Sequence, residues 1–203
     1  MKRYFITGIG TGVGKSVMSA LLCEALQADY WKPIQSGELD NSDSMTVQSL
    51  ISNPVSNFHP ESYRLSEPLS PHASAQRAGI DIDPSSIVPP STQNTLVIEG
   101  AGGLMVPLNN STLYIDLIDS FQAEVILVSR HYLGSINHTL LSAESLMLRR
   151  LPVKGIVFNG DENPETESVI LSMTGFPLLG RIPESNQLDK AFIRQQAAQF
   201  SQL

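Results

Sequence analysis

Apolar runs alternate along the chain with segments in which apolar residues recur at helical spacing. Several runs are continuous, which is typical of strands covered on both faces in a parallel sheet, and helices between them predict βαβ units. We therefore expect an α/β fold with a doubly wound, mostly parallel sheet. The expected strands are residues 4–7, 30–32, 95–99, 125–128, 153–159 and 177–179, and the expected helices are residues 16–28, 42–52, 114–121, 135–149 and 165–174.

Residues 53–90 break this pattern, because prolines interrupt any long element there. The segment could be a disordered linker, but Phe58, Tyr63, Leu65 and Leu69 supply apolar anchors. We expect an ordered excursion over the edge of the sheet where ligands bind, with one short helix over residues 71–78.

Chain length, net charge and cysteine content limit the number of domains and the classes of function that fit this sequence. With 203 residues the chain is expected to form one domain over residues 1–203. A net charge of −7 argues against binding to nucleic acid, which needs clustered Lys and Arg. The single cysteine, Cys23, is expected to be buried, and its isolation fits a reducing compartment. Because we find no apolar stretch of membrane-spanning or signal-peptide length, we expect a cytoplasmic protein without a membrane partner.

Residues 7–16 read Thr-Gly-Ile-Gly-Thr-Gly-Val-Gly-Lys-Ser and follow an apolar run, which resembles a phosphate-binding loop (P-loop) of nucleoside triphosphatases. Such a loop directs backbone N–H groups and a helix N-terminus at phosphate oxygens. Lys15 would add positive charge, and Ser16 a hydroxyl for magnesium. The usual spacing needs glycine at position 9, where this chain has Ile9; the loop begins one residue early, at Gly8. A merely flexible turn would leave the glycines unexplained. We expect ATP binding.

Polar residues after the other apolar runs are further candidates, since ligands bind beyond the carboxyl ends of such strands. Lys32 would enter the crevice beside the loop, although alone it could be a surface lysine. Glu99 precedes a glycine-rich turn, and a buried carboxylate there needs a cation or donors, whereas at an exposed strand end it would face solvent. Asp43 could simply cap a helix; with Ser16 and Glu99 it becomes a candidate Mg²⁺ ligand.

Taken together, these motifs resemble the dethiobiotin synthetases, ATP-dependent enzymes that close the ureido ring in biotin synthesis. The resemblance spans nearly the whole chain, and the early glycine of the loop is typical of that family. Its motifs are residues 8–16, Lys32 and Pro33 with Ser36 and Gly37, Asp43, residues 70–72, residues 99–103, residues 134–138 and Asn159.

The resemblance implies a reaction and its residues. A carbamate formed from 7,8-diaminopelargonate and CO₂ would be phosphorylated by ATP to a carbamic-phosphoric anhydride, and ring closure would give dethiobiotin, ADP and phosphate. Lys15 and Lys32 are the implied catalytic residues, and Ser16, Asp43 and Glu99 the implied ligands of Mg²⁺. The implied ATP-binding residues are Gly10, Thr11, Gly12, Val13, Gly14, Lys15, Ser16, Asp43, Glu99, Gly100, Ala101, Gly102, Asn159, Gly160, Pro183, Glu184 and Ser185.

The substrate would be held by Thr11 and Ser36 and by a helix start at Gly134, Ser135, Ile136 and Asn137. In the family that helix start receives the substrate carboxylate across a homodimer interface, so a homodimer is implied. Free N–H groups at a helix start suit such an anion.

Two other classes remain as alternatives. A partition-type regulatory ATPase shares this fold class but usually carries a signature lysine early in the loop, where this chain has Gly10 and Thr11. The ATP-binding domain of an amidotransferase-type synthetase would need a glutaminase partner with a reactive cysteine. Zinc is not expected, because the four histidines lack the paired spacing of a zinc site.

Overall fold

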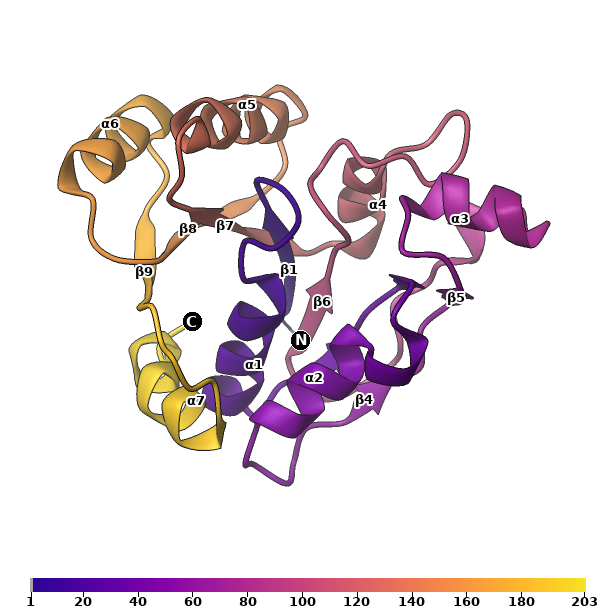
Figure 1. Ribbon diagram of the computed structural model, residues 1–203, viewed down its shortest axis with the longest axis horizontal. Helices are drawn as coiled ribbons and strands as arrows, with labels where there is room; N and C mark the ends of the chain where they lie inside the picture. Colours follow the sequence, from indigo (N-terminus) through magenta and orange to yellow (C-terminus); the bar gives the residue numbers. More distant parts are fainter. Residues whose placement is uncertain (1) are drawn as a thin grey trace.

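The computed structural model describes residues 2–203 and is built on a sheet of seven strands, all paired in parallel with their neighbours (Figure 1). The strands are β1 (Arg3–Gly8), β2 (Asp29–Trp31), β4 (Phe58–His59), β6 (Leu96–Glu99), β7 (Glu124–Arg130), β8 (Val153–Asn159) and β9 (Leu178–Ile182). In space they follow the order β4-β2-β6-β1-β7-β8-β9, so the strand that leads into the glycine-rich loop lies at the centre.

Helices cover both faces of this sheet. One face packs against α1 (Lys15–Leu26), α2 (Asp43–Leu50) and α7 (Lys190–Ala197), and the other against α4 (Tyr114–Phe121), α5 (Ser135–Leu148) and α6 (Pro164–Thr174). Residues along β1 alternate between the two cores: Tyr4 and Ile6 pack with α1, while Phe5 packs with α4. Both faces are therefore buried, which confirms the doubly wound α/β fold.

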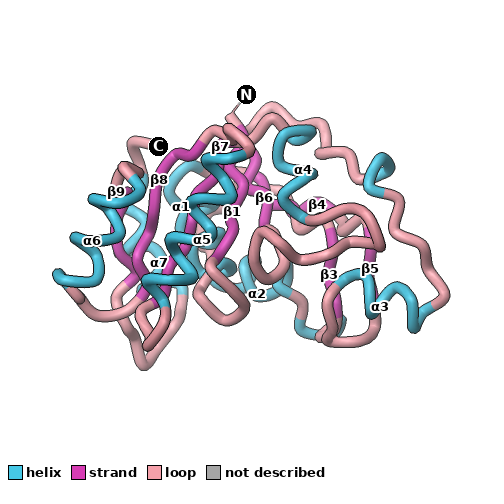
Figure 2. The backbone as a smooth tube through the Cα atoms, turned by 90° about the horizontal axis from the view of Figure 1, so that it is seen from above, coloured by secondary structure: helices cyan, strands magenta, loops and turns pink. Residues whose placement is uncertain are grey.

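Residues 53–90 form an ordered excursion, as expected. A second, two-stranded parallel sheet pairs β3 (Ile34–Ser36) with β5 (Tyr63–Leu65), and α3 (Pro71–Ala78) packs against it. Figure 2 shows this small subassembly at the end of the molecule opposite α6 and β9. Gly37, at φ +73°, lies so close to Pro68 that a Cβ there would meet the proline Cα at 2.6 Å. The excursion is thereby packed onto the turn that follows β3.

Every strand and helix expected from the sequence is present, with small shifts at the ends. Strand β9 continues to Ile182, beyond the expected end at residue 179. The sequence did not predict β3, β4, β5 or α7. The first three have only two or three residues, too few to show a period. Half of the residues of α7 are polar, and its buried residues are Ile193 and Ala197.

At the amino end of β2, the buried carboxylate of Asp29 joins three segments of chain. It accepts hydrogen bonds from the Asn57 backbone N–H (2.9 Å), Thr92 Oγ1 (2.6 Å) and Asn94 Nδ2 (2.9 Å) and lies 3.1 Å from His59 Nε2. Burial alone would raise the pKa of Asp29, but these donors outweigh it and lower the pKa to about 2. The cluster ties β4 and the approach to β6 onto β2.

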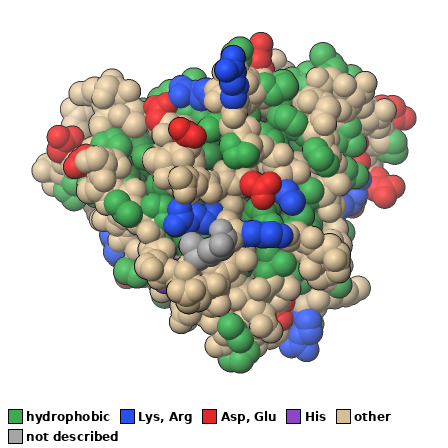
Figure 3. Space-filling model, turned by 180° about the vertical axis from the view of Figure 1, so that it is seen from behind, with side chains coloured by type: hydrophobic (Ala, Val, Ile, Leu, Met, Phe, Trp, Pro, Cys, Tyr) green, Lys and Arg blue, Asp and Glu red, His purple; other side chains and the backbone are tan. Residues whose placement is uncertain are grey.

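On the face seen in Figure 3, Lys and Arg side chains lie among acidic and uncharged groups. Within residues 2–203 we find no helix that is both long enough and apolar enough to cross a bilayer. Cys23 is fully buried on α1, as the sequence predicted.

Candidate active site

The carboxyl ends of β1, β2, β6 and β8 border a cavity of about 860 Å³. Residues from the glycine-rich loop, from the segment after β2 and from the excursion line it together, which confirms that the excursion covers this edge. The lining residues are Thr11, Gly12, Gly14, Lys15, Ser16, Val17, Lys32, Gln35, Ser36, Glu38, Asp43, Pro68, Leu69, Ser70, Pro71, Glu99, Ala101, Gly102, Val106, Arg130 and Asn159.

The glycine-rich loop joins β1 to α1 and turns at Gly14, the N-cap of the helix, with φ at 97°. A Cβ on Gly14 would meet Asn159 Nδ2 at 2.3 Å, so glycine is required for both the conformation and the close approach. No side chain caps α1, and its first N–H groups therefore remain available for an anion. Lys15 folds back over the loop, with Nζ donating to the Gly10 carbonyl at 2.9 Å.

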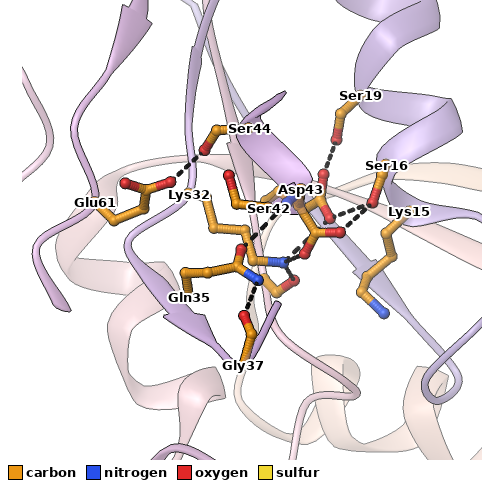
Figure 4. A network of polar contacts seen from close by, with 12 residues as sticks. Lys15, Ser16, Ser19, Lys32, Gln35, Gly37, Ser42, Asp43, Ser44 and Glu61 are labelled. Atoms are coloured by element: carbon orange, nitrogen blue, oxygen red, sulfur yellow. Dashed lines mark hydrogen bonds and ion pairs between the residues drawn. The ribbon is translucent and has the colours of Figure 1, made fainter. Parts of the chain in front are cut away.

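Lys32 lines the cavity, and in Figure 4 its ammonium group points at the Asp43 carboxylate. Its side chain is 4% exposed; Nζ pairs with Asp43 Oδ2 and lies 3.3 Å from Glu99 Oε1 and 3.5 Å from the Gly100 carbonyl. Burial would lower the pKa of Lys32, but Glu99 and Asp43 outweigh it and raise the pKa. Lys32 is therefore held as an ammonium.

The pKa of Lys15 moves in the other direction. Burial lowers it to about 8, against the attraction of Glu99, and the positive charge of Lys32 adds to the lowering. The two lysines therefore differ: the nearby acids already balance Lys32, while Lys15 has positive charge to offer an incoming anion.

Three side chains with oxygen atoms that could bind a metal lie close together beside Lys32. Ser16 Oγ lies 3.0 Å from Asp43 Oδ1 and 2.9 Å from Glu99 Oε1. Ser42, not Asp43, caps α2 by accepting the Met45 N–H at 3.3 Å, so the Asp43 carboxylate is free for the cavity. One hydroxyl and two carboxylates are hard oxygen donors of the kind that Mg²⁺ prefers. This donor set fits a magnesium ion that takes its remaining ligands from phosphate and water.

Residues 2–203 contain no group of three or more His, Cys, Asp or Glu side chains arranged to hold a metal. Mg²⁺ at a nucleotide site commonly uses one or two carboxylates together with substrate phosphates, and the two carboxylates of Asp43 and Glu99 match that number.

The segment after β2 shapes the wall opposite the loop. Gln35 Nε2 donates to the Gly37 carbonyl at 3.0 Å, and Gln35 Oε1 accepts the Asp43 N–H at 3.3 Å. Ser36 Oγ is buried without a hydrogen-bond partner among the described residues. A buried polar atom of this kind normally has a partner, so the hydroxyl is suited to a bound ligand.

Two further predicted segments lie side by side at the ends of β8 and β9. Asn159 Nδ2 donates to the Val13 carbonyl at 2.9 Å, and the Gly160 N–H donates to the Ile182 carbonyl at 2.9 Å, next to Pro183. Arg130 connects them to the loop, with Nη1 3.4 Å from the Gly12 carbonyl and Nη2 3.1 Å from Glu184 Oε1. Of these residues, Asn159, Arg130 and Gly12 line the cavity.

Several predicted site residues do not line the cavity. The helix start at Gly134, Ser135, Ile136 and Asn137 is elsewhere on the surface, beside a fully exposed Leu133. Outside the lining are also Gly10, Val13, Gly100, Gly160, Pro183, Glu184 and Ser185. Conversely, the cavity includes Gln35, Glu38 and Arg130, to which the sequence interpretation gave no role. Arg130 is the last residue of β7, two positions after the end of its apolar run, so the strand-end rule could have identified it.

A parallel sheet that feeds a glycine-rich loop, followed by an uncapped helix with Lys15 and Ser16 at its start, defines the P-loop class of nucleoside triphosphatases. A family model described as an AAA domain matches residues 2–191. A solved ParA family ATPase from Chlorobium tepidum superposes with a TM-score of 0.60 at 14% identity, covering 100% of this chain and 96% of that one, a likeness of fold.

Two curated relatives are much more similar in sequence. The chain is 53% identical to the ATP-dependent dethiobiotin synthetase BioD of Christiangramia forsetii, covering 98% of this chain and 96% of the relative. It is 50% identical to the protein of the same name from Cytophaga hutchinsonii, over 98% and 97% of the two chains. The chain belongs to the dethiobiotin synthetase family, a family of ATP-dependent enzymes.

Proposed function

We propose that this enzyme forms dethiobiotin from 7,8-diaminopelargonate, CO₂ and ATP, with release of ADP and phosphate. The proposal rests above all on one observation: the buried ammonium of Lys32 and the uncapped helix start beyond Lys15 face the same cavity. Phosphoryl transfer to an anion depends on positioning and charge neutralisation, which these two features can supply together.

The proposed chemistry has three steps. One amine of the substrate adds to CO₂ and loses a proton, which gives a carbamate. A carbamate oxygen attacks the γ-phosphorus of ATP, and the bond to ADP breaks to leave a carbamic-phosphoric anhydride. The second amine then attacks the carbonyl carbon and loses a proton, the bond from that carbon to the phosphate oxygen breaks, phosphate departs, and the ureido ring is closed. No covalent bond to the protein is needed.

In this proposal Lys32 and Ser36 hold the carbamate. Lys32 is a compact ammonium suited to a small anion, and Ser36 offers the unpartnered hydroxyl described above. Lys15, Thr11 and the backbone of Gly10, Gly12, Val13 and Gly14 would bind the phosphates. Gly100, Ala101 and Gly102 would add further contacts to ATP, and of these three Ala101 and Gly102 line the cavity. The protein's contribution is positioning and charge neutralisation in a partly dehydrated site.

Ser16, Asp43 and Glu99 are the residues we propose to hold Mg²⁺. When bound, the ion would neutralise negative charge on the phosphate oxygens. Lys32 contacts the carboxylates of both Asp43 and Glu99. In this proposal the Lys32 ammonium and the Mg²⁺ ion would therefore both interact with these two carboxylates.

Asn159 is proposed to recognise the base, with Gly160, Pro183, Glu184 and Ser185 beside it. Asn159 Nδ2 donates to the Val13 carbonyl, and its side-chain carbonyl oxygen accepts no hydrogen bond from residues 2–203, so this oxygen is available to a ligand. That oxygen can accept a hydrogen bond from the amino group of adenine, whereas guanine presents a carbonyl at the corresponding position. This arrangement supports ATP over GTP.

The helix start at Gly134, Ser135, Ile136 and Asn137 is proposed to bind the substrate carboxylate in a homodimer. Its absence from the lining of the cavity is explained if a second copy supplies this segment to each site. Exposed apolar side chains lie next to it in the chain, namely Tyr132, Leu133 and Ile136, as expected for an interface. We propose a single-domain, cytoplasmic enzyme with small-molecule substrates and no nucleic-acid or membrane partner.

Mass spectrometry of products formed from ¹³C-bicarbonate tests the function. Incubation with diaminopelargonate and Mg-ATP should give dethiobiotin that carries one labelled carbon, with one ADP per ring closed. ATP hydrolysis that ignores the diamine but is stimulated by DNA or membranes would instead favour a partition-type regulatory ATPase.

A further inference from the structure

We infer that Tyr30 and Ser19 are positioning residues for the proposed metal site, because they hold the Glu99 carboxylate from behind with one oxygen turned toward Ser16 and the cavity. This inference rests on the proposed magnesium role of Glu99. Neither residue lines the cavity, and both side chains are fully buried.

The two oxygens of Glu99 have separate partners. Oε2 accepts hydrogen bonds from Ser19 Oγ at 2.8 Å and from Tyr30 Oη at 3.0 Å. Oε1 accepts from Ser16 Oγ at 2.9 Å and lies 3.3 Å from Lys32 Nζ. The terminal torsion of a glutamate side chain is broad and has little preference of its own, so these donors determine its angle. Tyr30 and Ser19 therefore fix which oxygen faces the cavity.

The supporting donors come from two different elements. Ser19 follows Ser16 by three residues on α1, so one helix face offers both hydroxyls to the same carboxylate. Tyr30 lies on β2, which pairs with β6 in the register Tyr30 to Val97 and Trp31 to Ile98. Because side chains alternate along strands, Tyr30 and Glu99 share the sheet face covered by α1. The carboxylate is clamped between the helix and the neighbouring strand.

Within the described residues 2–203, Asp43 has no comparable support. Its side chain is 35% exposed, and its carboxylate oxygens contact Ser16 and Lys32, both at the cavity. Glu99 is 1% exposed and anchored on the side away from the cavity. We therefore expect Glu99 to be the fixed ligand of the proposed ion and Asp43 to be the one that adjusts.

The test measures metal binding without the ring-closing reaction. Mn²⁺ is titrated in place of Mg²⁺ into the enzyme with a non-hydrolysable ATP analogue, and free Mn²⁺ is followed by electron paramagnetic resonance. Tyr30→Phe keeps the ring, which packs 5.5 Å from Phe58 between centroids, and removes one oxygen. Loss of such a supporting hydrogen bond typically weakens metal affinity about 10- to 100-fold. We expect that loss for Tyr30→Phe and for Ser19→Ala, and a larger one for the double variant.

Matched controls separate positioning from packing. Tyr4→Phe removes another buried tyrosine hydroxyl from the same core, one that donates to the Leu203 carbonyl at 2.8 Å far from the cavity. Ser129→Ala removes a buried serine hydroxyl that pairs with Thr139 Oγ1 at 2.8 Å. Both controls should lower the melting temperature without changing Mn²⁺ affinity. Analogue binding in the absence of metal should stay the same in all four single variants.

Equal Mn²⁺ affinity in Tyr30→Phe, Ser19→Ala and the two controls would overturn the inference and leave the two residues as core packing. If Tyr30→Phe does not fold, the same comparison is decided by Ser19→Ala and Ser129→Ala. An unmodified protein that binds Mn²⁺ with the analogue but forms no dethiobiotin would remove the proposed function while leaving the positioning result valid. The two failures are thus distinguishable.

Discussion

Two carboxylates are buried at opposite ends of the neighbouring strands β2 and β6, one at the amino end and one at the carboxyl end. Asp29 opens β2 and Glu99 closes β6, and each is 1% exposed. Every polar neighbour of Asp29 is an amide, a hydroxyl or an imidazole that belongs to the surrounding segments. Glu99 Oε2 accepts hydrogen bonds from two buried hydroxyls, whereas Oε1 lies at the cavity beside the Ser16 hydroxyl and the Lys32 ammonium.

The difference shows that burial and hydrogen bonding alone do not identify a functional acid. The donors of Asp29 are tied to the fold, so they satisfy the charge permanently and contribute to stability. At Glu99 part of that task falls to Lys32 and to the proposed ion, both of which can also interact with a bound ligand. A functional carboxylate is therefore better recognised by the kind of partner than by the number of partners.

The strongest test of this comparison removes the cation. Lys32→Ala should lower the turnover number by about 10³-fold, the scale of losing a preorganised group that stabilises developing charge. Steady-state kinetics at saturating substrates measure this loss, and circular dichroism checks the fold. Lys32→Arg is the companion variant: it keeps the charge but replaces a point charge with a planar fork, so we expect it to remain impaired. Normal turnover in Lys32→Ala would remove the distinction between the two acids.

The next test neutralises the acid at the site. Glu99→Gln keeps the shape of the side chain but loses its negative charge, so the Mg²⁺ concentration that gives half-maximal turnover should rise about 100-fold, near the upper range seen for perturbed metal sites. The measurement is a magnesium titration at fixed ATP. An unaltered titration curve would exclude Glu99 as a ligand.

The smallest expected effect comes from the opposite end of the sheet. The pKa of Asp29 is lowered from 3.8 to about 2, which corresponds to about 2 kcal/mol of stability. Asp29→Asn should lose roughly this amount at neutral pH, measured by urea unfolding, with turnover per folded molecule unchanged. Because the native state binds fewer protons here than the unfolded state, the stabilisation is present above about pH 4. The two proteins should converge in stability as the pH falls toward 2; a constant gap would contradict the role given to Asp29.

Much of the fold was predictable because buried parallel strands produce long apolar runs that are visible in sequence. Strands β1, β6, β7 and β8 have four to seven residues each and are buried on both faces. The two-residue β4 exists only because Tyr30 and Trp31 supply a register for it. Such short strands result from tertiary pairing and have no local pattern of their own.

The site was predictable where residue type and strand end coincide, as for Lys32 and Glu99. Tyr30 and Ser19 were not predictable in the same way, because they contact Glu99 across separations of 69 and 80 residues and look like ordinary core and helix positions. Their roles depend on the register of β2 beside β6 and on which face of α1 meets the sheet. The glycines, by contrast, point to close approach even without a structure, although not to Asn159 as the group that approaches Gly14.

The hydrogen bond from Asn159 to the Val13 carbonyl joins the proposed base-reading residue to the phosphate-binding loop. Attempts to redesign nucleotide preference at Asn159 would therefore also disturb the loop, and selection for a new base would have to be accompanied by repair of the old backbone contact. The choice of nucleotide base and the binding of phosphate are therefore coupled, and a redesign would have to change both at once.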